Sequence, residues 1–183
     1  MRLDYRWIAA DDLEHLRDID RSEHITTAYG MRDGVLTSRS VDWHADGWRD
    51  DGGAHSFGHR IEFCREHLDK GARALGCFAN DGRLVGIGVM GPEVEPGVVE
   101  LAFLHVSRAH RRTGVATELL DRLTAWARQT GAHELYVSAT PSGSAVSFYQ
   151  RAGFDVTDEP IDEMLALEPE DIHMRRPLLA RST

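Results

Sequence analysis

Alternation of hydrophobic and polar positions predicts most of the strands in this chain. Leu3, Tyr5 and Trp7 alternate with charged residues, which is typical of a strand with one buried face. Residues 74–79 and 84–90 flank an Asn-Asp-Gly sequence whose two-residue turn chemistry favours a hairpin. Further strands are predicted at residues 35–41, 98–106, 135–139, 154–157 and 172–178, with 98–106 as a central strand.

Apolar residues spaced three or four apart predict the helices. The first has Leu13, Leu16 and Ile19 on one side, and Asp11 or Asp12 as its expected cap. The others are expected at residues 57–68, 114–130 and 145–152. A strand and a helix therefore come first, followed by a hairpin and a strand–helix–strand–helix unit. This order predicts a mixed α/β sheet with helices on its faces, as a single domain over residues 1–183.

Regular patterning weakens between residues 22 and 53, where five glycines interrupt it. Long irregular segments inside compact domains are commonly functional loops or lids. We therefore expect residues 22–53 to be irregular and to cover a binding site. Three aromatic residues of this segment either line that site or anchor the segment to the core, namely Tyr29, Trp43 and Trp48.

Composition narrows the functional classes. The 183 residues are 42% hydrophobic and 28% charged, a balance typical of one soluble domain. Thirty acidic and 21 basic residues give a charge of −9, which argues against a broad nucleic-acid-binding surface. The longest apolar run, around residues 84–90, is too short to span a bilayer, and the N-terminus lacks a signal-peptide core. Cys64 and Cys77 form neither a disulfide framework nor a zinc pattern, so a cytoplasmic protein is expected.

A basic turn between the strand at 98–106 and the helix at 114–130 carries the clearest candidate chemistry. The first amides of a helix have no partner within the helix and lie at the positive end of its dipole, so they attract anions. Small residues and Arg111 in this turn would let a phosphate approach the backbone. A basic turn that only caps the helix is the alternative. A P-loop is excluded, because no Lys-Ser or Lys-Thr pair follows Gly114.

Two motifs, in this order, resemble the GNAT N-acetyltransferase family. The first is Arg111-x-x-Gly114-x-Ala116, which resembles the family's acyl-coenzyme A signature. The second is Ser142-x-x-Ala145-x-x-Phe148-Tyr149-x-x-x-Gly153-Phe154, in which Ser142 replaces the usual Asn. The motifs cover residues 98–158, and the preceding hairpin extends the resemblance to residue 73. The resemblance implies a mostly antiparallel sheet of about seven strands, splayed at its middle, with helices on both faces.

The resemblance also implies which residues bind acetyl-coenzyme A, the expected acetyl donor. The pantetheine arm is expected to pair with the backbone at a V-shaped gap between the strands at 98–106 and 135–139. Ser142 and Ala145 are expected to contact the coenzyme at the start of the following helix. The backbone residues assigned to the pantetheine are Leu104, His105 and Val106, and those assigned to the pyrophosphate are Arg111, Arg112, Thr113, Gly114, Val115, Ala116 and Thr117.

Two residues are assigned catalytic roles by their match to family positions. Tyr149 is expected to protonate the departing thiolate. Glu100 is expected to be the base that removes a proton from the acceptor amine, directly or through water. His105, His173 and a chain of water molecules remain alternatives to Glu100.

The remaining features bear on the acceptor. Ten histidines are present, and His55 and His59 stand four residues apart on a predicted helix, but no metal-binding pattern accompanies them, so no metal is expected. Eight acids between residues 155 and 171 have no basic residue among them. They form either a solvated loop or a surface that attracts a cationic amine.

The expected reaction is acetyl transfer to the primary amine of a small molecule by direct attack in a ternary complex. Residues 22–53 would then cap the acceptor side. The alternatives are a peptide or protein acceptor, and a sensor that binds acyl-coenzyme A without catalysis. A homodimer is one assembly that the resemblance implies. Neither cysteine lies in the coenzyme motif, so no acetyl-cysteine intermediate is expected.

Overall fold

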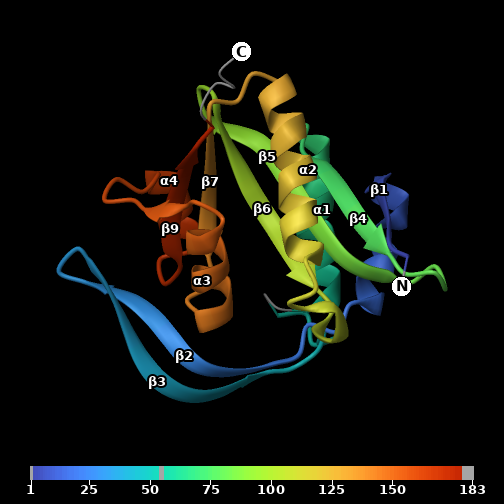
Figure 1. Ribbon diagram of the computed structural model, residues 1–183, viewed down its shortest axis with the longest axis horizontal. Helices are drawn as coiled ribbons and strands as arrows, with labels where there is room; N and C mark the ends of the chain where they lie inside the picture. Colours follow the sequence, from blue (N-terminus) through green and yellow to red (C-terminus); the bar gives the residue numbers. More distant parts are fainter. Residues whose placement is uncertain (1, 54–55, 179–183) are drawn as a thin grey trace.

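The computed structural model describes residues 2–53 and 56–178 of the chain. Its centre is a seven-stranded sheet in the order β1-β4-β5-β6-β7-β9-β8 (Figure 1). These strands are β1 (Asp4–Ile8), β4 (Arg73–Phe78), β5 (Leu84–Glu95), β6 (Val98–Val106), β7 (Glu134–Ala139), β8 (Asp155–Val156) and β9 (Ile172–Pro177). Only β6 and β7 pair in parallel, so the predicted mixed, mostly antiparallel sheet is confirmed.

Helices cover both faces of this sheet, as the sequence predicts. The helical segments are the 3₁₀ turns η1 (Ala10–Asp18) and η2 (Arg108–His110), and the α-helices α1 (Phe57–Asp69), α2 (Val115–Gln129), α3 (Gly143–Arg151) and α4 (Asp162–Leu167). One apolar cluster lies between the sheet and α2 with α3, and a second lies between the sheet and α1 with η1. None of the helices within the described ranges is long and apolar enough to cross a membrane.

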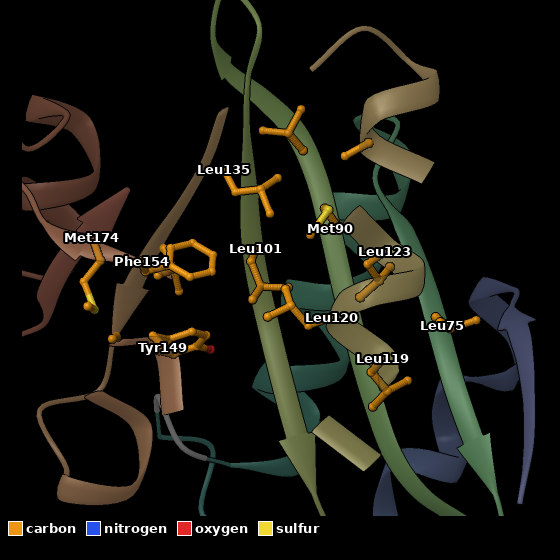
Figure 2. Packing of buried hydrophobic residues seen from close by; sticks show 14 of the residues in the cluster. Leu75, Met90, Leu101, Leu119, Leu120, Leu123, Leu135, Tyr149, Phe154 and Met174 are labelled. Atoms are coloured by element: carbon orange, nitrogen blue, oxygen red, sulfur yellow. The ribbon is translucent and has the colours of Figure 1, made fainter. Parts of the chain in front are cut away.

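The sheet is splayed at its middle. Residues 98–100 of β6 pair with residues 134–136 of β7, and beyond them no described strand pairs with this side of β6. The two strands diverge towards the C-terminal end of β6 (Figure 1). Apolar side chains hold the two halves together, with Leu101 and Leu120 on one side and Tyr149 on the other (Figure 2). Backbone groups of β6 are therefore available to a ligand without any strand having to separate.

The expectation that residues 22–53 are irregular is wrong, although the strand predicted at residues 35–41 is present. They contain a long hairpin of β2 (Glu23–Arg32) and β3 (Val35–Ala45), which forms a separate two-stranded sheet. Asp33 and Gly34 both have positive φ in its turn, which is the conformation that two-residue hairpin loops favour. Many side chains on both strands are exposed, so the alternation lacks the apolar positions that mark a half-buried strand. The hairpin passes beside the beginning of α3 (Figure 1).

Three local predictions are also corrected. The first helix is a 3₁₀ segment whose N-cap is Ala9, and no side chain caps it. The turn between β4 and β5 spans three residues, because the Ala79 amide donates to the Arg83 carbonyl and Gly82 has positive φ. The acidic stretch after β8 is not a simple loop, because it contains the short helix α4.

Candidate active site

The turn between β6 and α2 presents unpartnered helix amides. Gly114 is the N-cap of α2, has a φ of 92°, and no side chain caps the helix there. A Cβ atom at Gly114 would meet nothing within 4 Å, so the backbone is open to a ligand at this point. The amides of residues 114–117 are the ones that an α-helix leaves without an internal partner. Val115 contributes only its amide, because its side chain is buried in the core.

The Arg111 side chain fixes the shape of this turn. Its Nε donates to the Val106 carbonyl at 3.1 Å, one terminal nitrogen donates to the Arg21 carbonyl at 3.0 Å, and the other lies 3.3 Å from the Glu23 carboxylate. The Arg111 amide donates to the Arg108 carbonyl, so it is not among the open amides. Arg111 therefore positions the turn, whereas Arg112 is exposed beside it.

Strand geometry narrows the predicted pantetheine contacts. The Ser107 amide donates to the Val85 carbonyl of β5. Because backbone groups of successive strand residues point to opposite sides, those of His105 also face β5, whereas those of Leu104 and Val106 face the splay. The backbone of Leu104 and the amide of Val106 are thus the groups that can pair with an inserted chain, because the Val106 carbonyl already accepts a hydrogen bond from Arg111 Nε.

These features fit coenzyme A. Its pyrophosphate needs hydrogen-bond donors at a positively polarised helix end, and the start of α2 supplies them. Its pantetheine arm carries amides, and the β6 edge beside the splay supplies complementary backbone groups. The exposed guanidinium of Arg112 adds positive charge next to the open amides.

Ser142 and Ala145 lie at the start of α3, as predicted, and they contact each other. The Ser142 hydroxyl accepts a hydrogen bond from the Ala145 amide at 3.3 Å and lies 3.1 Å from the Ser144 hydroxyl. Ser142 also forms a backbone bridge with Ala28 of β2. Ser142 therefore caps α3 and connects the helix to the hairpin, so the serine has a structural role in addition to the coenzyme contact predicted for it.

Tyr149 lies on α3 with its hydroxyl directed towards β6 (Figure 2). Only 8% of the residue is exposed, and its ring packs against Phe148 and Phe154 at centroid distances of 5.2 and 5.5 Å. Within residues 2–53 and 56–178 the hydroxyl has no hydrogen-bond partner. Burial, with a contribution from the charge of Asp171, raises the pKa of Tyr149 well above its usual value. The hydroxyl therefore keeps its proton at neutral pH and can donate it.

Glu100 lies on β6 at the last position paired with β7, and its side chain is only 7% exposed. One carboxylate oxygen is 3.7 Å from His67 Nε2 of α1. His67 Nδ1 hydrogen-bonds to the Phe63 carbonyl at 2.7 Å. Burial lowers the pKa of His67, but the nearby Glu100 carboxylate and the hydrogen bond to the Phe63 carbonyl outweigh it and raise the pKa overall. Glu100 is thus a buried carboxylate beside the splay with a histidine partner.

The other two base candidates have different surroundings. His105 packs against Phe103 and Trp48, at ring-centroid distances of 4.4 and 5.8 Å. Burial and the charges of nearby arginines lower the pKa of His105 to about 3, which makes it a weak base. His173 has partners at both nitrogens: Nδ1 lies 2.8 Å from the Tyr136 hydroxyl, and Nε2 lies 3.1 Å from a carbonyl. Burial lowers the pKa of His173, so it is a neutral member of a hydrogen-bond network.

The sequence did not distinguish two acids near the splay, Glu168 and Asp171, from the rest of the acidic stretch. Burial raises the pKa of Glu168; a hydrogen bond from Ser138 opposes this rise, and the charge of Glu100 adds to it. Burial and the charge of Glu168 raise the pKa of Asp171 to about 6. Arg60 acts on both carboxylates in the opposite direction. We call Glu100, Glu168 and Asp171 the acidic cluster.

Within the predicted acidic stretch, Glu168 and Asp171 are partly buried, whereas the others are exposed. These exposed acids are Asp155, Asp158, Glu159, Asp162, Glu163 and Glu170. The stretch is therefore mostly a solvated surface with two members turned inward. The only signal in the sequence was the absence of basic residues, which does not distinguish these two from their neighbours.

The aromatic residues of the N-terminal part have mixed roles. Trp48 donates its Nε1–H to the Ile19 carbonyl at 2.9 Å and packs against Phe57, so it fastens the chain after the hairpin onto the core. Trp43 is 43% exposed on β3. Of the two histidines noted on the predicted helix, His55 lies outside the described residues.

A splayed sheet with open helix amides at one end and a buried tyrosine across the opening is the arrangement expected of an acyl-coenzyme A-dependent transferase. Residues 39–154 match the acetyltransferase (GNAT) family, which is well over half of the chain. The chain belongs to the GNAT family of acetyltransferases and is an acetyl-coenzyme A-dependent N-acetyltransferase. None of the curated protein sequences matches it significantly.

Solved structures share the fold. A nourseothricin acetyltransferase is 22% identical with a TM-score of 0.73, over 98% of this chain and 100% of that chain. A proposed streptothricin acetyltransferase from Bacillus anthracis str. Ames, in complex with acetyl coenzyme A, is 15% identical with a TM-score of 0.69, over 96% of both chains. The PaiA N-acetyltransferase from Thermoplasma acidophilum, in complex with coenzyme A, is 18% identical with a TM-score of 0.64, over 97% of this chain and 99% of that chain.

Proposed function

We propose that this enzyme transfers an acetyl group to a primary amine of a cationic small molecule. The observation that carries the proposal is the acidic cluster beside the splay, whose carboxylates lie close enough for their charges to act on one another. The Tyr149 hydroxyl, directed towards β6, is close enough to this cluster for the charge of Asp171 to act on it. Carboxylates held in partly buried surroundings bind ammonium groups through charge-assisted hydrogen bonds. Similar folds named for nourseothricin and streptothricin acetylation support a small-molecule acceptor.

Direct transfer in a ternary complex requires the amine to lose one proton. The coenzyme supplies the acetyl group as a thioester. Glu168 and Asp171 would hold the ammonium groups, and Glu100 would take the proton, directly or through water. The amine nitrogen then attacks the carbonyl carbon, so that a C–N bond forms and the C–S bond breaks. Tyr149 donates its proton to the departing sulfur, and orientation of the two reactants contributes much of the acceleration.

The hairpin of β2 and β3 supports a small acceptor more than a peptide. It is tied to the beginning of α3 by the bridge between Ala28 and Ser142 and by the Tyr29 amide, which donates to the Pro141 carbonyl at 2.9 Å. A segment anchored in this way covers the approach beside α3. An extended peptide would need that approach open.

The test measures release of free thiol from acetyl-coenzyme A with a panel of monoamines, diamines, polyamines, aminoglycosides and peptides. Glu168→Gln and Asp171→Asn should raise the KM for diamines and polyamines about tenfold or more, and change the KM for monoamines much less. Glu170→Gln is the matched control, because Glu170 is an exposed acid of the same segment. Turnover of peptides alone, or an unchanged polyamine KM in both variants, would contradict the proposal.

A further inference from the structure

The outer face of the hairpin brings together two histidines and one aspartate. His24 of β2 and His44 of β3 are directly opposite in the strand register. Asp42 lies two residues before His44, so strand alternation places it on the same face. Their candidate ligand atoms all lie within 4.8 Å of one another. The three side chains are exposed, and they lie well away in sequence from the acidic cluster and Tyr149.

The candidate ligand atoms of these three side chains lie close to one another. His24 Nε2 lies 2.7 Å from an Asp42 carboxylate oxygen. The rings of His24 and His44 stack with centroids 4.4 Å apart and planes 10° from parallel. The strand register shifts between Ile25 and Thr27, where β3 has one residue more than β2. A bulge of this kind re-aims nearby side chains, and here it lies directly beside Asp42.

We propose that His24, Asp42 and His44 form a binding site for a divalent transition metal of the zinc class. Two imidazole nitrogens and one carboxylate oxygen are a donor set that suits Zn²⁺ and Co²⁺. Tetrahedral coordination with bonds of about 2.0 Å brings ligand atoms to about 3.3 Å from one another. The exposed side chains reach that spacing by rotation, without moving the core. A water molecule completes the fourth position.

The position of the site gives the metal a structural consequence. The site lies at the open end of the hairpin, where His24 follows Glu23, the residue that pairs with Arg111 of the coenzyme-binding turn. A bound ion would join β2 to β3, which form a sheet of two strands in the described part of the chain. It would thereby stiffen the segment that covers the beginning of α3. Histidine spacing along a single helix does not reveal this group, because its members come from two strands.

Isothermal titration of the tag-free protein with Zn²⁺ tests the site, and the visible absorption of a Co²⁺ complex reports its ligands. We expect one ion per chain. His24→Ala and His44→Ala should each weaken binding about tenfold or more, and Asp42→Asn should do so as well. His15→Ala is the matched control, because His15 is an exposed histidine 3.4 Å from an aspartate with no second histidine beside it.

A second measurement locates the ion independently of affinity. Hydrogen exchange should slow on addition of Zn²⁺ at the amides of β2 and β3 near the bulge, and this protection should vanish in His44→Ala. Thermal unfolding of each apo variant should match that of the native chain, because the three side chains are exposed. Absence of Zn²⁺ binding, binding that survives both histidine substitutions, or protection confined to other segments would overturn the proposal.

Discussion

Replacing Tyr149 by phenylalanine should lower catalysis while leaving stability nearly unchanged. The ring of Tyr149 packs against Phe148 and Phe154, whereas its hydroxyl has no hydrogen-bond partner in the described part of the chain and is not among the fully buried unpaired atoms there. Phenylalanine keeps the ring contacts and removes only the hydroxyl. A hydroxyl that reaches solvent carries little desolvation penalty, so Tyr149→Phe should change the stability of the apo fold by less than about 1 kcal/mol. That limits the change in Tm to about 2–4 °C for a chain of this size.

The same substitution should lower turnover. A positioned general acid accelerates a reaction about 10²–10⁴-fold, so kcat should fall about 100-fold or more, while the affinity for acetyl-coenzyme A stays within about twofold. Thiol release gives kcat, calorimetric titration gives the affinity, and thermal unfolding gives the stability. Unchanged kcat would refute the acid role of Tyr149. A Tm lowered by more than about 4 °C would refute the inference that its hydroxyl is unpartnered.

Tyr136→Phe is the matched comparison. The Tyr136 hydroxyl lies 2.8 Å from His173 Nδ1 and accepts a hydrogen bond from the Ile161 amide at 3.2 Å. Removing it leaves the Ile161 amide without this partner and leaves His173 Nδ1 with only Ser138 Oγ at 3.3 Å, so stability should fall by about 1–3 kcal/mol. Of the two tyrosine-to-phenylalanine changes, only Tyr136→Phe should therefore lower the Tm clearly.

Substitutions at three further positions test the site. Gly114→Asp should abolish acetyl-coenzyme A binding in a calorimetric titration. Gly114→Ala should bind the coenzyme more weakly and should cost about 1 kcal/mol of stability, because residue 114 has a positive φ. Tight binding by the aspartate variant would refute the assignment of Gly114 to the pyrophosphate site. The pKa of Asp171 is raised to about 6, so ionisation of this carboxyl destabilises the fold as the pH rises from about 4 to 6. Asp171→Asn should abolish this loss of stability when denaturant unfolding is measured across that pH range. An unchanged dependence of stability on pH would show that the carboxyl is solvated. Ser142→Ala should cost about 1 kcal/mol through loss of the α3 cap, and an unchanged unfolding midpoint would show that the cap contributes nothing.

The strand, turn and helix proposed to bind the coenzyme could be predicted from the sequence because their determinants are local. The turn before α2 is encoded within a few consecutive residues, and Gly114 has the left-handed backbone conformation that glycine permits. The helical spacing of apolar residues in α2 and the mostly apolar sequence of β6 were equally clear signals. The splay itself came from the family resemblance, and the register of β6 with β7 confirms it.

The acceptor side could not be predicted in the same way. Glu168 and Asp171 are partly buried in the turn between α4 and β9. The position of that turn depends on the pairing of β9 with β7, which joins segments far apart in sequence. The β2–β3 hairpin carried a local signal in its Asp33-Gly34 turn, which strongly favours a hairpin. Exposure of its strands removed the apolar alternation that would have directed attention to it.

The three-residue seam between β6 and β7 has a consequence for how the molecule resists unfolding. Directional hydrogen bonds hold each half of the sheet together internally, whereas the two halves cohere mainly through apolar packing between residues such as Leu101 and Phe154 (Figure 2). Such packing has no preferred direction and tolerates small shifts. The sheet can thus be splayed at its middle while the protein still unfolds as one cooperative unit. The reason is that the contact between its two halves depends on buried apolar area instead of strand pairing.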